Sequence, residues 1–418
     1  MRNLKRALSL ALAFIMVMGL MIVGTSAKSY TDSDKIENQA AVEILGEIGV
    51  MIGNEDGSFA PDRVVTRAEM AVIITRILYG NNLNVDQFKG LNTFTDVPEW
   101  ADGFVNLCAS LGIVAGRGNG IFDPNATVTT AEAVLMLSRA LGYFQNPAEF
   151  GDNWQLASMK RATQVGIIGG DMVLQASEGL TRDDVALVTF NTLTKAVPVQ
   201  YNELLNVYYN VNQGVIYALE FNYLQTLGYT NFSLVYKSNQ QAEYGRPATT
   251  WGIGSYVAAG SGTASGIEKD KLTADGGLLP TYVRMLDKDK IITVANTPVY
   301  VYSNGTKEKD IYSDLGAAAC NEKDYDWTAF VNGKEVAVNA PVKNNTNNYK
   351  FTDKGAVTEI YVDDDTQTVT VVEINYYLGQ VYSVNNGTTT IRTLSNGGKI
   401  LDDRTFATTQ FNDDDYVV

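Results

Sequence analysis

The sequence predicts a multidomain, exported protein in which an all-α unit of three repeats precedes a β-rich domain. Three observations lead to this prediction. A leader-like segment opens the chain, one residue pattern recurs three times over residues 30–198, and residues from about 250 onward are rich in β-branched and aromatic residues. Recurrence of one pattern at this spacing is typical of repeat architectures, and β-branched runs bounded by turn residues are typical of strands.

Residues 1–27 have the three-part layout of a secretory signal peptide. Arg2, Lys5 and Arg6 form a basic head, an apolar run covers residues 7–24, and Thr25-Ser26-Ala27 supplies small residues at the exit. A run of this length also suits a membrane anchor, but its flanks favour cleavage after Ala27. No second apolar run of that length follows. The mature chain is therefore expected to have no stable membrane span and to be held at a surface non-covalently.

Charge and composition exclude several functions. Removing the three basic leader residues takes the formal net charge from −15 to −18, so nucleic acid is an unfavourable partner. Cys108 and Cys320 are the only cysteines, which excludes a disulfide framework, and Cys108 is expected to be a buried apolar residue. The chain has no histidine, which removes Ser-His-Asp and Cys-His nucleophile pairs and His-ligated zinc. Carboxylate, Lys or Tyr chemistry and oxygen-ligated metals are the enzymatic options left.

The repeated pattern has four parts. They are an aromatic-x-Asp start, a Gly-Ile/Val-x-x-Gly turn, a Gly-x-Phe-x-Pro loop and a Thr-Arg-Ala-Glu helix start. A third copy begins near Phe150-Gly151-Asp152 and lacks the Gly-x-Phe-x-Pro loop. We predict repeats at 30–90, 91–149 and 150–198. The first copy has these parts at 30–32, 49–53, 57–61 and 66–69, the second at 94–96, 112–116, 120–124 and 129–132, and the third keeps 166–169 and 181–184.

Each copy predicts a helix, a loop and a second helix. In the first copy the buried face of the first helix is expected at Val42, Ile44, Leu45 and Ile48, with Gly49 ending the helix. The second helix begins with a capping box, in which the hydroxyl of Thr66 accepts from the N–H of Glu69 and the Glu69 carboxylate bonds back to Thr66. Thr129 with Glu132, and Thr181 with Asp184, repeat this arrangement, and Met70, Ile73, Ile74 and Ile77 continue the buried face in the first copy.

These combined motifs resemble the S-layer homology (SLH) domain, and three such domains after a signal peptide resemble its usual arrangement. The resemblance covers roughly residues 30–195. It implies a pseudo-trimeric helical bundle that binds secondary cell-wall polysaccharide, typically through a pyruvylated sugar. It also implies grooves between adjacent repeats, and the arginine of the Thr-Arg-Ala-Glu element as a recurring ligand contact.

The residue chemistry agrees with an anionic ligand. Backbone N–H groups at a capped helix start carry partial positive charge, and an arginine there adds a bidentate donor for a carboxylate. Arg67 and Arg182 are therefore predicted to bind the polymer, with surface ion pairs as the alternative. Thr130 replaces the arginine in the second copy and Asp183-Asp184 adds negative charge in the third, so the Arg67 groove is favoured. The predicted wall-binding residues are Arg67, Arg182, Thr66, Glu69, Thr129, Glu132, Thr181 and, as sugar-stacking or packing residues, Trp100 and Trp154.

Residues 200–418 are predicted to form one or more β-rich outer domains. Val215–Leu227 suggests a short helix, 252–266 a Gly-Ser loop, and Ile291–Tyr302 a strand-rich segment. Two hairpins are expected, one with its tip at 363–368 and one turning at Asn385-Asn386-Gly387. The final residues, 415–418, suggest an opening strand and hence a piece of a longer surface protein.

Two acidic runs, Asp363-Asp364-Asp365 and Asp413-Asp414-Asp415, offer oxygen ligands for calcium. They lack the spacing of a defined calcium loop, so solvated turn charge is the favoured interpretation, and we expect no cofactor.

The leading hypothesis is a non-catalytic, secreted protein of the cell wall or surface layer. Its repeats would bind pyruvylated wall polysaccharide, and its β-rich part would project outward and self-assemble into a lattice. The alternatives are a wall-anchored glycoside hydrolase that uses two carboxylates, or a surface adhesin.

Overall fold

The computed structural model describes residues 22–24, 30–91, 94–169, 172–205, 207–212, 215–217, 222–224, 229–258, 267–269, 281–303, 306–321, 324–343, 356–364, 366–385, 387–395, 404–406 and 416–417. The chain divides into two compact units. The helical unit comprises Gly24–Lys237 and Thr250–Ile292, and the sheet unit comprises Met1–Val23, Ser238–Thr249 and Thr293–Val418. Apart from β1 (Ile22–Gly24), the predicted signal peptide lies outside the described residues.

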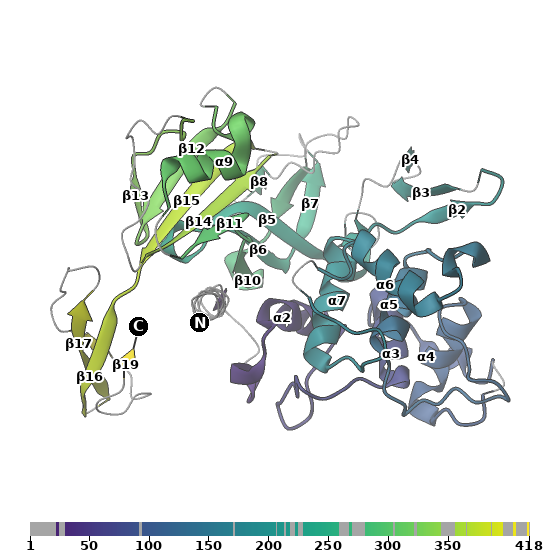
Figure 1. Cartoon of the computed structure of the whole chain (residues 1–418). Coiled ribbons are helices and arrows are strands. Elements are labelled where there is room, and N and C mark those ends of the chain that lie inside the picture. The colour runs from purple at the N-terminus through teal and green to yellow at the C-terminus, as the bar shows by residue number, and fades with distance from the viewer. Residues whose placement is uncertain are drawn as a thin grey trace. The chain divides into compact units, whose positions relative to one another are not determined.

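Three helix pairs form the first part of the helical unit (Figure 1). Each predicted repeat holds one pair, and the described loops also contain three short 3-10 helices, at Ser33–Lys35, Val85–Phe88 and Pro147–Phe150. The pairs are α2 (Gln39–Glu47) with α3 (Arg67–Tyr79), α4 (Glu99–Ser110) with α5 (Thr130–Ala140), and α6 (Trp154–Gln164) with α7 (Arg182–Thr194).

The apolar faces predicted for the first pair are buried. Val42, Ile44 and Leu45 are fully enclosed, and the face of α3 that carries Met70 and Ile74 is equally buried. The glycine that ends the first helix is needed for its backbone conformation, because Gly49 has a φ of 73°, which side chains rarely adopt. Cys108 is also fully buried, as predicted.

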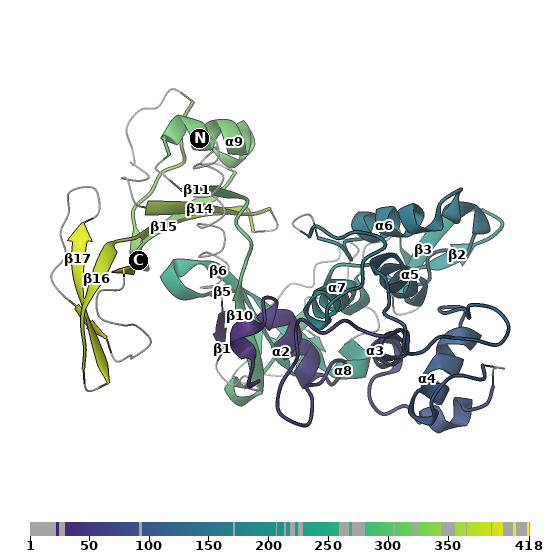
Figure 2. The same ribbon diagram turned by 60° about the horizontal axis from the view of Figure 1, so that its bottom comes forward.

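The helix pairs contact one another in a cycle (Figure 2). The second helix of each pair packs against the first helix of another: α3 against α4, α5 against α6, and α7 against α2. Each pair therefore covers part of the apolar surface of both others. This arrangement supplies the burial that two short helices cannot achieve alone.

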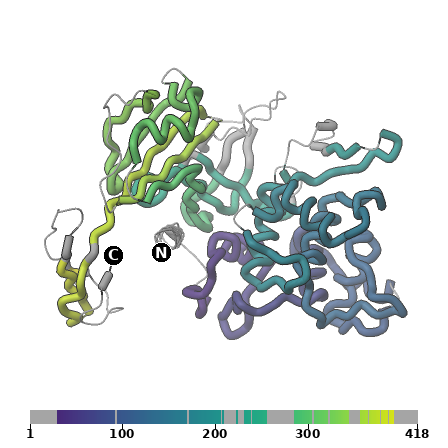
Figure 3. The backbone as a smooth tube through the Cα atoms, in the orientation of Figure 1, coloured from purple at the N-terminus to yellow at the C-terminus, as the bar shows by residue number. Residues whose placement is uncertain are grey.

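The chain after residue 198 continues to pack on the helical unit. Figure 3 traces the hairpin of β2 (Gln200–Asn202) and β3 (Val207–Asn212) from the third helix pair, and the rings of Tyr143 and Tyr208 lie 5.3 Å apart. Tyr223 is buried and its hydroxyl donates to the Ile77 carbonyl at 2.7 Å. The unit also contains β4 (Val215–Tyr217), α8 (Tyr229–Phe232), β7 (Ser255–Ala258), β8 (Ile267–Lys269) and β9 (Thr281–Arg284), while β5 (Leu234–Gln241), β6 (Pro247–Ile253) and β10 (Lys290–Ala295) continue from one unit into the other.

Two local predictions in this region were wrong in part. The helix expected from Val215 begins instead as β4, because Val215 and Ile216 pair antiparallel with β3. The loop expected from residue 252 is strand up to 253 and again at 255–258. Gly252 is required there by a close approach, since a Cβ would lie 2.4 Å from the Met285 sulfur. Within the expected helix, Tyr223 and Leu224 are helical, which agrees with the prediction, and apart from Asn222 and Gly254 the remaining residues of both segments lie outside the described residues.

The sheet unit is built on a five-stranded sheet with the order β11-β14-β15-β12-β13. In it β12 and β15 are parallel and the other neighbours are antiparallel. The helix α9 (Glu308–Ala319) lies across one face of this sheet (Figure 1), where Ile311 packs with Ala329, Ile360 and Val371. The strands are β11 (Tyr300–Tyr302), β12 (Asp326–Val331), β13 (Lys334–Val336), β14 (Ala356–Asp363) and β15 (Thr368–Asn375).

Both predicted hairpins are confirmed. β14 and β15 pair on either side of the tip at 363–368, and β16 (Leu378–Asn385) pairs with β17 (Thr388–Ser395) across the Asn-Gly turn, with Gly387 at a φ of 78°. β18 (Arg404–Phe406) and β19 (Tyr416–Val417) flank the second hairpin in an antiparallel sheet. The strand-rich segment predicted at 291–302 is also confirmed, as β10 and β11.

Among the described residues, no helix combines the length and apolar character needed to cross a bilayer.

Candidate functional site

The aspartate of each aromatic-x-Asp element holds the following loop. Asp32 accepts hydrogen bonds from the backbone N–H groups of Phe59 and Ala60, both at 2.8 Å. Asp96 does the same for Phe122 and Asp123, at 2.8 and 2.7 Å. Partial burial raises the pKa of each carboxyl, but these N–H groups outweigh it and leave both pKa values below the usual 3.8. The ionised aspartates therefore fix the two Gly-x-Phe-x-Pro loops.

The motif aromatics explain the last glycine of the turn. A Cβ on Gly53 would lie 2.4 Å from the ring of Tyr30, and one on Gly116 would lie 2.7 Å from the ring of Phe94. Each ring also contacts the loop phenylalanine of its own repeat, with centroids 5.5 and 5.4 Å apart. A side chain at either glycine would displace the ring and with it the loop.

The second helix of each pair begins at a threonine cap. Thr66 with Glu69 and Thr129 with Glu132 form complete capping boxes, as predicted. Thr181 accepts from the Asp184 N–H at 3.1 Å, but the shorter Asp184 side chain bonds the Thr181 hydroxyl instead of the backbone. The third box is thus half formed.

The first two N–H groups of each of these helices are used by a neighbouring loop. The N–H of Arg67 donates to Ala126 at 3.0 Å, that of Thr130 to Glu178 at 2.7 Å, and that of Arg182 to Arg63 at 2.8 Å. The next N–H in each helix donates to the same three loops. The expectation that free N–H groups would meet an anion here is therefore wrong, because the repeats satisfy these donors for one another.

The Arg67 guanidinium is a buried clamp between the first two repeats. Its Nε donates to the Phe122 carbonyl at 3.1 Å and its Nη2 to the Ala115 carbonyl at 2.9 Å. Nη1 pairs with Glu132 at 3.1 Å, and the group stacks 4.7 Å from the centroid of Phe122. Burial lowers the pKa of Arg67, and Glu132 opposes that shift.

Arg182 repeats this clamp between the third repeat and the first. Its Nε and Nη2 donate to the carbonyls of Phe59 and Ile52 at 2.8 and 2.9 Å, and it stacks 4.6 Å from the centroid of Phe59. At the remaining junction, the hydroxyl of Thr130 reaches the Glu178 carbonyl at 3.0 Å. One geometry thus recurs at two junctions and in a shortened form at the third.

A groove of about 190 Å³ opens beside Arg67. It brings together three predicted site residues, Arg67, Glu132 and Trp154, each from a different repeat. It also contains two residues that the sequence analysis missed, Arg117 and Arg139. Three guanidinium groups and one carboxylate line the groove, which gives it a formal charge of +2 in a chain of net charge −15.

The missed arginines differ in how available they are. Arg117 pairs with Glu132 at 2.9 Å, yet its side chain is 46% exposed. Arg139 is half-buried and lies 5.3 Å from the Phe150 centroid; burial alone lowers its pKa. Overlaying the repeats places Arg139 on Arg76, which also has a pKa lowered by burial. This coincidence was the signal that could have identified Arg139.

The other predicted site residues lie outside this groove. Trp100 is the second residue of α4 and is 55% exposed, whereas Glu69 forms an ion pair with Arg63 at 2.8 Å. Their role in wall binding stays a prediction, as does that of the remaining residues, which are Arg182, Thr66, Thr129 and Thr181.

The acidic runs are occupied by protein contacts where the structure describes them. Asp363 accepts from the Thr366 N–H at 3.0 Å and Asp364 from the Tyr325 hydroxyl at 2.8 Å. Within the described ranges, no cluster of three metal-ligating side chains occurs. Asp365 and 413–415 lie outside those ranges, so calcium binding stays a prediction.

Known proteins share the repeat region. The S-layer homology domain family matches residues 29–71 and 93–134. These segments contain Asp32 and Asp96, each of which holds the loop of its own repeat, and both complete capping boxes. Two SLH repeats lie here. They identify the first two helix pairs as SLH domains.

The similar proteins include a cell surface protein, a cell wall protein and an endoglucanase. A cell surface protein of Thermoanaerobacter kivui is 32% identical over 192 residues, which are 45% of this chain and 24% of that protein. The middle cell wall protein of Brevibacillus brevis is 30% identical over 189 residues, 44% of this chain and 17% of its own length. An endoglucanase of a Bacillus species is 25% identical over 224 residues, covering 48% and 23%. The chain thus spans less than a quarter of each of these relatives.

The SLH repeats and these relatives establish the location of the protein. It is a secreted protein of the cell wall or surface layer.

Proposed function

We propose that the three helix pairs form one three-repeat SLH bundle that anchors a non-catalytic surface-layer protein to the cell wall. The ligand is an anionic secondary cell-wall polysaccharide, and a pyruvylated sugar of that polymer enters the Arg67 groove. The observation that carries the proposal is the formal charge of +2 in this groove of an acidic chain.

Within the groove, the arginines differ in their contacts, which supports different roles. The guanidinium of Arg67 donates to two carbonyls and to Glu132, so Arg67 shapes the groove and contributes positive charge. Arg117 is exposed and can turn a guanidinium edge toward a ligand carboxylate. Glu132 stays neutralised by Arg67 when Arg117 leaves it. Trp154 offers an exposed ring on which a sugar face can stack.

A sedimentation assay with purified wall tests this proposal. The full chain is mixed with native wall and with wall whose ketal-linked pyruvate has been removed by mild acid. We expect binding to the native wall and its loss on the treated wall. Arg117→Gln should weaken binding about tenfold or more, since a charge-assisted hydrogen bond contributes about 1.5–3 kcal/mol.

The matched control is Lys89→Gln, which also removes one positive charge from the helical unit but pairs with Asp86 outside the groove. It should bind like the unmodified protein. Equal binding to both walls would refute the pyruvylated ligand. Full binding by Arg117→Gln, at unchanged stability, would refute the role of this groove.

We also propose that the part of the chain beyond the repeats projects from the wall and assembles with neighbouring copies. This proposal rests on the surface-layer and cell-surface relatives. Electron microscopy of purified protein after salt removal tests it, because an ordered lattice supports assembly and a monodisperse monomer at every concentration contradicts it.

A further inference from the structure

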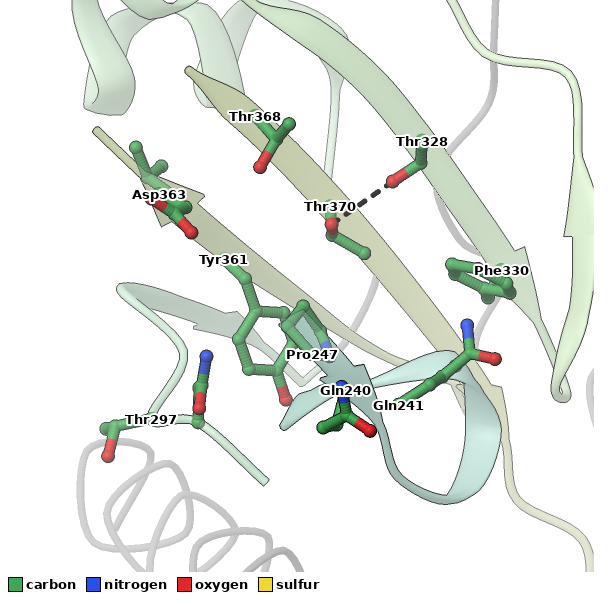
Figure 4. Close-up of a pocket in the computed structure, with 13 residues that line it drawn as sticks. Gln240, Gln241, Pro247, Thr297, Thr328, Phe330, Tyr361, Asp363, Thr368 and Thr370 are labelled. Carbon is green, nitrogen blue, oxygen red and sulfur yellow. Dashed lines mark hydrogen bonds between the residues drawn. The ribbon is translucent and has the colours of Figure 1, made fainter. Parts of the chain in front are cut away.

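A polar cavity lies in the sheet unit on the sheet face opposite α9 (Figure 4). Its volume is about 250 Å³. Alternate residues of three strands form its floor, because side chains two positions apart share one face of a strand. Gln240 and Pro247, which belong to β5 and β6, also line it and lie near Tyr361 in Figure 4. The floor residues are Thr328 and Phe330 of β12, Thr368 and Thr370 of β15, and Tyr361 and Asp363 of β14.

The strand register arranges the floor in rows. Thr370 pairs with Thr328 on one side and with Tyr361 on the other. The two threonine hydroxyls lie 3.1 Å apart, so one donates to the other and the pair keeps free acceptor sites for a ligand. Asp363 lies in the next row, opposite Thr368. Hydroxyl groups, a carboxylate and an aromatic ring are therefore neighbours on one face of the sheet.

A buried ion pair holds the Tyr361 wall. Arg246 and Glu359 are completely buried and bonded through two contacts of 2.8 Å each. The Tyr361 hydroxyl donates to Glu359 at 2.7 Å, which turns the ring edge of Tyr361 into a fixed wall. Burial lowers the pKa of Arg246, but its bonds to Glu359 outweigh this and keep it charged.

Backbone geometry holds the Phe330 wall. Gly245 adopts a φ of 86°, and a Cβ there would lie 2.2 Å from the Phe330 ring. The ring thus packs directly on the Gly245 backbone. Both aromatic walls are therefore fixed before any ligand arrives, which lowers the entropy cost of binding.

The lining chemistry selects an uncharged, hydroxyl-rich ligand. Among the described lining residues there is no lysine or arginine, and Asp363 is the carboxylate. Threonine hydroxyls and glutamine and asparagine amides both donate and accept, as sugar hydroxyls do. An aromatic ring beside them suits the apolar C–H face of a sugar. An anionic group would lie near the Asp363 carboxylate and would find no lysine or arginine among the described lining residues.

We propose that this cavity is a binding site for a neutral carbohydrate, with one sugar unit seated on the Thr328–Thr370 pair against Phe330. The site binds without cleaving, since glycoside hydrolysis by the usual route needs a second carboxylate across the bond and the described lining holds Asp363 alone. The site shares no lining residue with the Arg67 groove and takes an uncharged ligand, whereas that groove is proposed to take an anionic one.

Calorimetric titration of the full chain tests this site. The probes are neutral hexasaccharides of glucose, xylose and N-acetylglucosamine, with hexagalacturonate as the anionic comparison. At least one neutral probe should bind with a Kd of about 1 mM or tighter. Thr370→Val keeps the β-branched shape and removes the hydroxyl, so it should weaken that binding about 2- to 10-fold.

The matched control is Thr390→Val on β17, where the same change also breaks a threonine–threonine contact, of 3.3 Å, outside the cavity. It should leave binding of the neutral probe unchanged. Three results would overturn the proposal: no neutral probe binding below about 10 mM, hexagalacturonate binding more tightly than every neutral probe, or Thr370→Val binding like Thr390→Val.

Discussion

Replacing Arg67 should destabilise the helical unit as well as change the groove. Arg67→Met keeps a flexible, unbranched side chain over Phe122 but removes the guanidinium. The carbonyl of Phe122, which is fully buried, and that of Ala115, which is exposed, then lose a charged donor. A hydrogen bond from a charged donor contributes about 1.5–3 kcal/mol when it is buried and less where water can replace it, and the apolar contact of methionine with Phe122 offsets part of this loss. Glu132 retains Arg117 at 2.9 Å and adds little to the cost. The expected loss is about 2–4 kcal/mol.

Urea denaturation followed by far-ultraviolet circular dichroism measures this loss, with Arg117→Met as the comparison. Arg117 has one ion pair and an exposed side chain, so its replacement should cost less than about 1 kcal/mol. Wall binding should rank the two variants differently, because Arg117→Met loses binding while its stability is intact. If the free energy of unfolding of Arg67→Met lies within about 1 kcal/mol of that of the unmodified protein, the Arg67 guanidinium does not hold the groove in place.

Other predictions concern the helix caps, the aspartates Asp32 and Asp96 that hold the loops, and the buried thiol of Cys108. Thr66→Ala and Thr129→Ala should each lower the free energy of unfolding by about 1 kcal/mol in the same assay, and serine at either position should restore most of it; a failure of serine to rescue would contradict the capping role. The folded-state pKa values of Asp32 and Asp96 lie below 3.8, so their stabilisation is present above that pH and is lost as the pH falls through the folded values; Asp32→Asn should flatten this acid-side loss in urea midpoints measured from about pH 5 to about pH 2, and an unchanged slope would count against it. Burial raises the pKa of Cys108 to about 12, so iodoacetamide at about pH 8 should label it only after unfolding, and native labelling detected by mass spectrometry would show that the site opens.

Short-range chemistry was predictable from the sequence. The Thr66 and Thr129 capping boxes and the Asn-Gly hairpin depend on residues within a few positions of each other, and all formed as predicted. The errors came from long-range contacts. Val215 lies in a strand because it pairs with β3. Gly252 lies in a strand where the Met285 sulfur leaves no room for a side chain.

The candidate site shows the same division. The sequence identified Arg67 and Trp154, which lie in the groove, from their motif positions. It could not show that the backbone N–H of Arg67 donates to Ala126 and its guanidinium to Phe122, because those partners belong to another repeat. Arg117 was missed because the first repeat has Asn54 at the equivalent position, so no recurrence marked it.

The cycle of helix starts and loops has a consequence for shortened chains. A helix pair on its own exposes unpaired backbone N–H groups at the start of its second helix and the matching loop carbonyls at another edge. Two copies of one pair can therefore bind each other head to tail. Joined head to tail, three identical pieces would close on themselves, and closure prevents growth into a filament. A polypeptide that carries one such pair is therefore expected to exist as a closed trimer, with each junction formed between separate molecules.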